Sequence, residues 1–345
     1  MTAPVAPETG IQPGTAVPQG SVAPGSVAPG TVAPGTIAPC TIAPGSVAIV
    51  LSTFNGATFL SAQLDSFMAQ SDIAWCLFWR DDGSVDDTVA LMQAFAEGPA
   101  AGRCHRVDHA GHLGVTPSYM ALLRAAVAHG AQVVAFSDQD DVWLPHKLSR
   151  SLAEIGADPA PALYCSRQVL VDAALNPVCE SAPVRVRPGL APALTQNIAT
   201  GCTVMLNRAA AVLVASSRAP PVTLHDWWSY LVVAAAGGRI VADQQTTVLY
   251  RQHTTNAVGA PPSNSRRAIA ALRRGPGVFM AVFRAHVAAL QSQPELLAPA
   301  SRNTIDIVAT GLAGGPLAKL RALSHGLRRQ THAETALFRC WFLLG

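Results

Sequence analysis

An acidic turn that directly follows a short apolar run limits this sequence to few folds. Residues 132–136 are mostly apolar and predict a buried strand. Asp138, Asp140 and Asp141 come next, and residues 144–147 suit the first turn of a helix. Carboxylates packed this closely repel one another unless a hard cation or the donor groups of a ligand share the site. An acidic helix cap is the simpler alternative.

Two further polar turns follow predicted strands. Residues 47–51 and 75–79 are apolar runs, and polar residues 53–56 and 81–84 come directly after them. Strands that alternate with helices of about ten to fifteen residues indicate an α/β fold with a mostly parallel sheet flanked by helices. Such sheets bind ligands at the carboxyl ends of their strands, where all three polar turns fall. The sequence therefore predicts a binding site at this edge.

The pattern loosens beyond residue 150. Residues 197–205, which include Thr200 and Gly201, predict a polar turn that runs into another strand. His225 and Asp226 open an apolar helix that ends at two glycines. Short strands are expected at residues 239–241 and 247–251.

Composition divides the chain into three parts. Residues 1–45 contain pentapeptides of the form Ser/Thr-Val/Ile-Ala-Pro-Gly and predict a disordered leader, because they offer little apolar bulk to offset the entropy of ordering. Residues 46–260 predict the α/β domain. Residues 261–345 hold eleven Lys/Arg and three acids, a net charge of +8, which leaves −5 for the rest of the chain. We expect this last part to be a basic helical extension.

Two placements of the basic extension stay open. Arginines and apolar residues at helical spacing are typical of helices that lie on anionic membranes. The same helices can instead pack on the domain with their arginines outward. A nucleic-acid role is not supported, because no stacking motif accompanies the basic residues.

Three features of the sequence indicate where in the cell the protein is located. No apolar run reaches the roughly 18 residues of a membrane-spanning helix, and the first residues do not resemble a secretory signal. Seven irregularly spaced cysteines indicate reduced thiols. We expect a cytoplasmic protein, peripheral on the inner face of the cell membrane if the basic extension binds lipid.

The acidic turn suits a metal-assisted nucleotide site. The glycine-rich phosphate loops of common nucleotide-binding folds are absent, so a diphosphate would need a cation and basic side chains. Asp138 and Asp140, two residues apart on an extended segment, can converge on one Mg²⁺ or Mn²⁺ and one ribose. Asp81 or Asp82 would hold the base.

The order of six motifs resembles the family 2 glycosyltransferases, and most closely their bacterial rhamnosyltransferase-like branch. The motifs run from residue 47 to 259: Ser-Thr-Phe-Asn-Gly, Asp-Asp-Gly-Ser-x-Asp-x-Thr, Ser-Asp-Gln-Asp-Asp-Val-Trp, Thr-Gly-Cys, His-Asp-Trp-Trp and Tyr-Arg-Gln-His-x-x-Asn-x-x-Gly. The resemblance implies a GT-A fold and an inverting transfer from a nucleotide-diphospho-sugar to a glycan or lipid-linked glycan in cell-surface polysaccharide synthesis.

The resemblance also implies roles for the donor side of the site. Asp138 would approach the ribose and Asp140 the cation and diphosphate. Arg251 and His253 would contact the diphosphate or the cation, although a structural histidine is the alternative for His253. The nucleoside would be lined by Thr53, Asn55, Asp81 and Asp82, of which the two aspartates could instead cap a helix.

On the acceptor side, Asp226 stands where the family places its general base. The alternative for Asp226 is a helix N-cap. Thr200 and Gly201 are expected near the acceptor, together with Trp227 and Trp228, whose alternative is the hydrophobic core.

One departure and two rival functions remain. His112 stands where many relatives have Asn before Leu-Gly, which puts a nucleotide contact from this loop in doubt. A sugar-nucleotide nucleotidyltransferase would usually carry a glycine-rich basic loop after the first strand, and residues 52–56 have one glycine and no basic residue. A non-catalytic glycan- or nucleotide-binding module would not need Asp138, Asp140 and Asp226 together.

Overall fold

The computed structural model describes residues 45–344, apart from residues 72, 109–110, 157 and 254–263. For residues 264–275 only the backbone is described. The leader expected over residues 1–45 therefore lies outside the described residues, except for Gly45.

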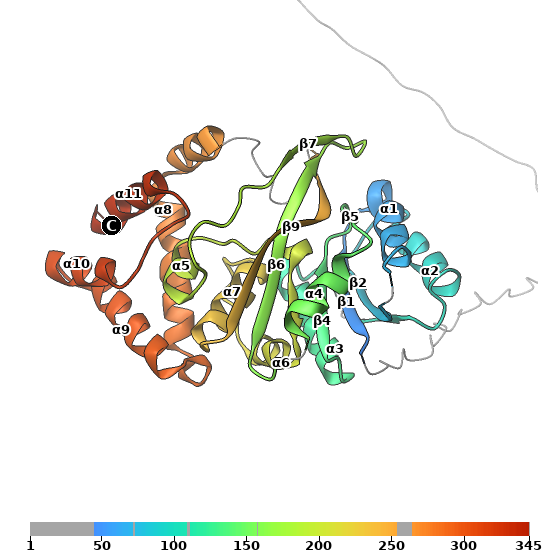
Figure 1. Ribbon diagram of the computed structural model, residues 1–345, viewed down its shortest axis with the longest axis horizontal. Helices are drawn as coiled ribbons and strands as arrows, with labels where there is room; N and C mark the ends of the chain where they lie inside the picture. Colours follow the sequence, from blue (N-terminus) through green and yellow to red (C-terminus); the bar gives the residue numbers. More distant parts are fainter. Residues whose placement is uncertain (1–44, 72, 109–110, 157, 254–263, 345) are drawn as a thin grey trace, which may run out of the picture. The chain divides into compact units, whose positions relative to one another are not determined.

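Four parallel strands carry the polar turns. They lie side by side in the order β3 (Cys104–Arg106), β2 (Trp75–Asp81), β1 (Val47–Thr53) and β4 (Val133–Ser137) (Figure 1). In β1, Val47, Ile49 and Leu51 enter one buried cluster and Ala48 and Val50 the other, since successive side chains of a strand point to opposite faces. The apolar run that predicted this strand is thus buried on both sides.

The rest of the sheet is mixed. The short strand β8 (Met205–Asn207) runs antiparallel to β4 and to β6 (Ala162–Val171), and β6 pairs in parallel with β9 (Arg239–Arg251). The edge strands β5 (Val142–Trp143) and β7 (Pro177–Glu180) pair antiparallel with β9 and β6. The sheet is therefore more evenly mixed than predicted beyond β4. The two short strands expected at residues 239–251 form one.

Helices cover both faces of the sheet. The cluster on one face contains residues of α1 (Ala57–Met68), α2 (Thr88–Glu97) and α4 (Lys147–Ile155). The cluster on the other face contains residues of α3 (Val115–Ala128), α6 (Arg208–Ser216) and α7 (His225–Ala235). Fully burying one large aliphatic side chain stabilises a fold by roughly 1.5–3 kcal/mol, so these two layers fix the strand ends firmly.

The C-terminal part is helical and packs against the α7 side of the core. After the short α5 (Leu190–Thr195) and the 3₁₀ turn η1 (Gly201–Thr203) in the body, it comprises α8 (Asn264–Gln291), η2 (Pro294–Leu296), α9 (Pro299–Ala313), α10 (Pro316–Ser324) and α11 (His332–Leu344). Phe283, Phe338 and Phe342 belong to the same buried cluster as Trp228 of α7. Packing on the domain, one of the two expected placements, therefore occurs.

Two further findings bear on location. Over the described residues, no helix combines the length and apolar character needed to cross a bilayer. Cys76 is disulfide-bonded, so the expectation of reduced thiols throughout is wrong for this residue. Five other cysteines are free: Cys104, Cys165, Cys179, Cys202 and Cys340.

Candidate functional site

The polar turns after β1, β2 and β4 are joined by side-chain hydrogen bonds. Thr53 Oγ1 donates to Asp81 Oδ1 at 2.9 Å. Gln139 accepts from Phe54 N and donates to Phe54 O, both at 2.9 Å. A Cβ on Gly56 would lie 2.3 Å from Gln139 Oε1, so a larger residue there would displace the Gln139 side chain. The acidic turn and the first polar turn therefore form one surface.

The residues expected around the nucleoside stabilise their own turns. Asp81 Oδ2 accepts from Gly83 N at 3.0 Å and from Ser84 N at 2.8 Å. Asn55 takes a left-handed backbone with φ 47°, and its Oδ1 accepts from Val85 N at 2.9 Å. Asn tolerates this conformation better than most residues. Thr53, Asn55 and Asp81 thus lie together at the edge where the sequence placed them.

The Asp82 carboxylate interacts mostly with other groups of the protein. Its carboxylate pairs with the buried Arg80 and accepts from Leu113 N at 2.7 Å and Gly114 N at 2.8 Å. Burial acts to raise the pKa of Asp82, but these hydrogen bonds outweigh it and lower the pKa below its usual value. The side chain is 4% exposed, which leaves little of it for a ligand.

His112, the departure from the family pattern, belongs to the same network. Its Nδ1 lies 3.0 Å from Asp82 Oδ2, and its ring centroid lies 5.3 Å from that of Phe54. The loop is thereby attached to Asp82 and to the first polar turn.

Asp140, Arg251 and His253 are brought together, as predicted for the donor side. His253 Nε2 lies 2.8 Å from Asp140 Oδ2. Arg251 Nε donates to Asp140 O at 2.7 Å, and its guanidinium lies 4.5 Å from the centroid of Phe59. Arg251 at the end of β9 and His253 just after it therefore supply a guanidinium and an imidazole to the acidic turn. Both residues lie 110 or more positions further along the chain than the aspartates they contact.

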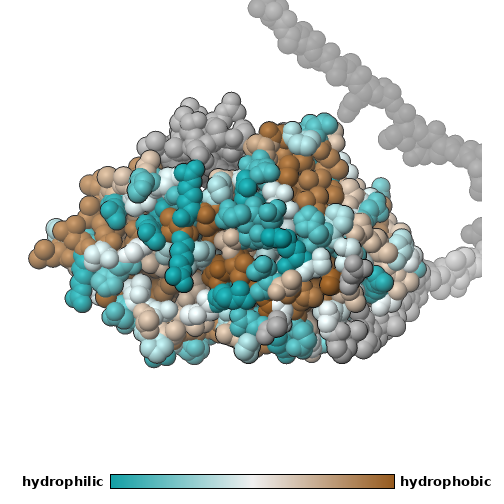
Figure 2. Space-filling model, in the orientation of Figure 1, coloured by the Kyte–Doolittle hydropathy of each residue, from teal (hydrophilic) through white to brown (hydrophobic). Residues whose placement is uncertain are grey.

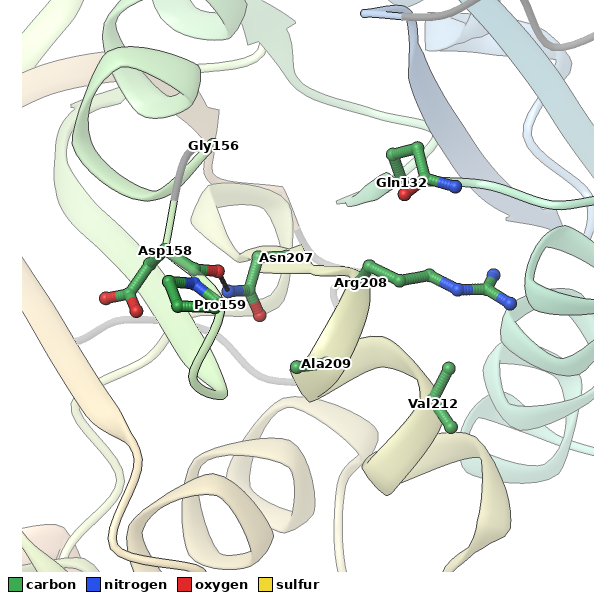
Figure 3. Close-up of a pocket in the computed structure, with 8 residues that line it drawn as sticks. All are labelled: Gln132, Gly156, Asp158, Pro159, Asn207, Arg208, Ala209 and Val212. Carbon is green, nitrogen blue, oxygen red and sulfur yellow. Dashed lines mark hydrogen bonds between the residues drawn. The ribbon is translucent and has the colours of Figure 1, made fainter.

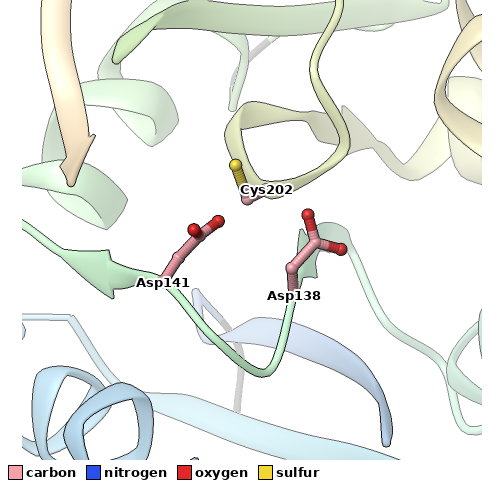
Figure 4. A group of neighbouring side chains, drawn as sticks. All are labelled: Asp138, Asp141 and Cys202. Atoms are coloured by element: carbon pink, nitrogen blue, oxygen red, sulfur yellow. The ribbon is translucent and has the colours of Figure 1, made fainter. Parts of the chain in front are cut away.

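Asp138 and Asp141 of the acidic turn converge with Cys202 (Figure 4). One potential ligand atom from each residue lies within 4.8 Å of the other two. Burial and the charge of Asp140 raise the pKa of Asp138 to about 7, and the charge of Asp226 adds to this effect. Burial, Asp140 and Asp138 raise the pKa of Asp141 well above its usual value. Among the described residues, Asp141 Oδ2 has no hydrogen-bond partner.

This donor set fits a divalent cation. Carboxylate oxygens are the ligands that Mg²⁺ prefers, and imidazole together with carboxylate also suits Mn²⁺. Among the described residues, Asp141 Oδ2 is buried without a hydrogen-bond partner, and the pKa values of Asp138 and Asp141 are raised. Both features are expected where buried carboxylates lack a counter-charge. Asp138 and Asp141 would therefore supply that cation with ligands, together with Cys202. Asp140 and His253, 2.8 Å apart, form a second pair next to them.

Asp226 lies in the first turn of α7 and is buried. Its Oδ1 accepts from Trp227 N at 2.5 Å. Burial raises the pKa of Asp226 to about 6, although hydrogen bonds from Trp227 N, the Asn197 side chain and Gly201 N act to lower it. Leu224 is the N-cap residue of α7, so the alternative that Asp226 caps this helix is wrong. A buried carboxylate with this pKa has the properties of a general base.

Thr200 and Gly201 lie next to Asp226. Thr200 O accepts from Thr203 N at 2.8 Å and thereby closes the 3₁₀ turn η1. A Cβ on Gly201 would lie 2.9 Å from His225 Nε2 and 3.8 Å from Asp226 Oδ2. The small residue therefore allows the turn to approach the carboxylate.

The two tryptophans of α7 differ. Trp227 is partly buried, and its Nε1 donates to Ala193 O at 2.7 Å. Trp228 is completely buried, and its Nε1 donates to Ser217 Oγ at 2.7 Å. Trp228 belongs to the core and offers no surface to an acceptor, which corrects its expected placement.

Tyr119 and His225 are site residues that the sequence did not reveal. Tyr119 OH lies 2.8 Å from Asp138 Oδ1, and the Tyr119 ring stacks on the His225 imidazole with centroids 3.7 Å apart. Neither ring nitrogen of His225 has a hydrogen-bond partner in the described part of the chain. In sequence, Tyr119 is one member of an apolar helical stripe, and only its hydroxyl distinguished it from the core.

A separate hollow of about 490 Å³ lies at the opposite edge of the sheet (Figure 3). It is lined by Gln132, which precedes β4, and by Asn207 at the end of the antiparallel β8. Asp138 follows the other end of β4, about 20 Å away along the extended chain. The hollow is therefore separate from the site.

Comparison with known proteins finds a similar family. Residues 48–176 match the family model described as Glycosyl transferase family 2. The matched segment contains β1 to β6 and the acidic turn. This part of the chain is therefore similar to glycosyltransferase family 2, the resemblance that the motif order indicated.

The curated relatives match only part of this chain. An uncharacterised glycosyltransferase of Nostoc sp. is 35% identical over 104 residues, which are 30% of this chain and 31% of that protein. The dTDP-rhamnosyl transferase RfbG of Shigella flexneri is 24% identical over 112 residues, which are 30% of this chain and 35% of RfbG. These matches span about a third of the length of the curated relatives.

A solved structure matches the fold over most of the chain. S. aureus TarS 1–349, crystallised in complex with UDP-GlcNAc, superposes with a TM-score of 0.50 at 15% identity, over 86% of this chain and 90% of TarS 1–349. At this identity the match concerns the fold alone, and it confirms the expected GT-A architecture.

Proposed function

We propose that the protein is a metal-dependent, inverting glycosyltransferase. It transfers a sugar from a nucleotide-diphospho-sugar to a hydroxyl of a glycan or lipid-linked glycan. The observation that carries this proposal is that the buried Asp226 of α7 lies close to Asp138, which follows β4 in the acidic turn. The charge of Asp226 is near enough to raise the pKa of Asp138.

The donor is held by the strand ends. Thr53, Asn55 and Asp81 line the nucleoside, and Asp138 approaches the ribose. Asp140 and His253, 2.8 Å apart, hold Mg²⁺ or Mn²⁺. When bound, the cation neutralises charge on the diphosphate leaving group. Arg251 keeps the backbone of the acidic turn in place through Asp140 O and adds a positive charge behind the diphosphate.

The acceptor is activated by Asp226. Its carboxylate accepts the proton of the acceptor hydroxyl as that oxygen attacks the anomeric carbon opposite the diphosphate. The anomeric configuration is thereby inverted. A pKa near 6 leaves Asp226 largely ionised at neutral pH but still basic enough to take the proton. Thr200, Gly201 and Trp227 border the acceptor.

Rhamnose is the donor sugar that we favour. The motif order is closest to the rhamnosyltransferase-like branch, and a rhamnosyl transferase is among the similar proteins. The acceptor is a growing cell-surface polysaccharide. We place the enzyme in the cytoplasm. The five free cysteines of the described chain support this placement, whereas the disulfide-bonded Cys76 does not fit it.

A donor panel tests the proposal. Purified protein is incubated with UDP-, GDP- and dTDP-sugars, with and without Mn²⁺, and nucleoside diphosphate release and sugar transfer are measured. We expect Mn²⁺-dependent turnover of one donor, lost in Asp140→Asn and Asp226→Asn. Synthesis of nucleotide-sugar from a nucleoside triphosphate and a sugar phosphate would instead identify a nucleotidyltransferase. Donor binding without turnover would identify a binding module.

A further inference from the structure

Four leucines are exposed on the last two helices. Leu317 is 84% and Leu320 54% exposed on α10, and Leu343 is 41% and Leu344 87% exposed on α11. Lys319 Nζ donates to Leu343 O at 2.9 Å, which brings the two helices together. We refer to these four residues as the leucine face. Figure 2 shows hydrophobic residues at the left of the view, where α10 and α11 lie in Figure 1.

The leucine face is not the core side of these helices. Ala322 and Leu323 of α10 are buried, as are Phe338, Trp341 and Phe342 of α11. Leu320 and Arg321 are three and four residues from Leu317 and share one side of α10 with it, and their exposure shows that this side faces solvent. Each helix thus has a second apolar side, and exposed apolar residues that cluster in this way mark interaction sites.

Basic side chains surround the leucine face. Residues 316–344 contain five Lys/Arg and one acid, a net charge of +4. Arg321 and Arg339 are exposed and Lys319 is half-buried. The single acid, Glu334, lies 3.9 Å from Arg329 and does not offset these three. A hollow of about 430 Å³ adjoins Leu317 and Arg321, and Asp306 is the acid in its lining.

Exposed leucines among cations match the chemistry of an anionic lipid surface. Leucines enter the boundary between headgroups and acyl chains, and Lys and Arg remain at the level of the phosphates. A cation near such a surface strengthens binding about fivefold.

A second copy of the chain fits this surface less well. A two-fold dimer buries the same patch from both partners. The leucines of one copy would then meet those of the other, and Lys319 and Arg321 would approach their own counterparts. Like charges brought together across an interface oppose binding.

We propose that the leucine face, with Arg321 and Arg339, binds the surface of an anionic bilayer. The contact is peripheral, since the leucines lie on the outer sides of helices whose opposite sides are buried in the core. It is separate from the donor site and does not depend on the proposed reaction. It would hold the enzyme on the surface that carries a lipid-linked acceptor.

Vesicle co-sedimentation of the full chain tests this proposal. One set of vesicles contains equal parts of phosphatidylglycerol and phosphatidylcholine, and the other contains phosphatidylcholine alone. We expect binding to the anionic vesicles and at least about tenfold weaker binding to the neutral ones. The Leu317→Glu/Leu320→Glu variant should bind the anionic vesicles at least about tenfold more weakly than the parent chain.

Matched variants keep the test decisive. Val178→Glu/Val222→Glu introduces the same charge at two exposed valines outside these helices and should bind like the parent chain. Leu317→Ser/Leu320→Ser removes the apolar groups without adding charge and should also weaken binding. Circular dichroism checks that each variant is folded. Equal binding by the parent chain and both leucine variants, or no binding by the parent chain, overturns the proposal. So does a dimer in sedimentation velocity that only the leucine variants lose.

Discussion

Tyr119 and His225 stack face to face, with ring centroids 3.7 Å apart and ring planes inclined by 14°. Tyr119 belongs to α3 and its hydroxyl reaches Asp138, whereas His225 immediately precedes Asp226 on α7. The stack therefore connects the carboxylate proposed for the ribose with the carboxylate proposed as base. We expect both rings to position these carboxylates.

The Tyr119→Phe variant separates the effect of the hydroxyl from the effect of the ring. The variant keeps the stack but removes the contacts of the hydroxyl with Asp138 Oδ1 at 2.8 Å and with Ser137 O at 2.6 Å, and one such hydrogen bond contributes about 1–2 kcal/mol. We expect KM for the donor to rise about fivefold to thirtyfold, while kcat changes less. Steady-state kinetics over a donor titration measures both constants.

Tyr119→Leu is the companion variant. It removes the ring as well as the hydroxyl, so kcat should fall in addition to the rise in KM. If Tyr119→Phe leaves KM unchanged, the hydroxyl does not position Asp138 for the donor.

Much of the fold could be predicted, because apolar runs in the sequence mark its strands and polar residues mark their ends. The cores of β1, β2 and β4 are continuous apolar runs, and each ends in polar residues. The long β9 was divided in two by the prediction, because its middle contains Asp243, Gln244 and Gln245. β6 pairs with residues 239–242 and again with residues 246 and 248–251, so the strand continues past an irregularity at this polar segment, and pairing is a long-range property.

Residues of the candidate site could be predicted only where the local sequence indicates their chemical role. Asp138, Asp140 and Asp226 are acids at strand or helix ends, so their positions were expected. Tyr119 was missed because its contacts with Asp138 and His225 span 19 residues and about a hundred. Trp228 was misplaced because sequence does not tell which side of the apolar helix α7 faces the core.

Asp226→Asn tests the base. The amide cannot accept the acceptor's proton, and general base catalysis contributes about 10²–10⁴-fold to a rate. We expect kcat to fall by that factor, with donor affinity retained in a binding titration. In the parent enzyme, kcat/KM should rise with pH through about 6, because Asp226 must be ionised. That limb should be absent from the residual activity of the variant.

His253→Ala tests the cation site through metal affinity. The imidazole lies 2.8 Å from Asp140 Oδ2, and removing one ligand typically weakens a metal site by an order of magnitude or more. We expect the Mn²⁺ concentration for half-maximal activity to rise at least about tenfold. Direct Mn²⁺ binding to chelator-treated protein, followed by electron paramagnetic resonance, should weaken in parallel.

His146→Ala is the matched control, since this exposed histidine precedes α4 and its Nε2 contacts only the Thr246 carbonyl at 3.3 Å among the bonds described. The control should behave as the parent enzyme. Unchanged Mn²⁺ binding in His253→Ala would assign the imidazole a structural role.

Gly201→Ala tests the close approach of η1 to the base. The added Cβ would lie 2.9 Å from His225 Nε2, so either the turn or the imidazole must move. Small displacements of catalytic groups can cost about a hundredfold in rate. We expect kcat to fall about tenfold to a hundredfold, with donor KM less affected. Gly189→Ala is the control, because a Cβ there meets no atom within 4 Å, and it should leave kcat near that of the parent enzyme.

The raised pKa of Asp226 also makes stability depend on pH. Between pH 4 and 6 the folded protein keeps a proton on Asp226 that the unfolded chain has already released. The free energy of unfolding therefore falls as pH rises through this window, by up to roughly 3 kcal/mol for a shift of about two pKa units. Asp226→Asn lacks this loss, so the variant should be more stable than the parent at pH 8 and lose the advantage towards pH 4. Urea unfolding at both pH values measures the difference. A stability difference that is the same at pH 4 and pH 8 would mean that the Asp226 carboxylate is not buried as described.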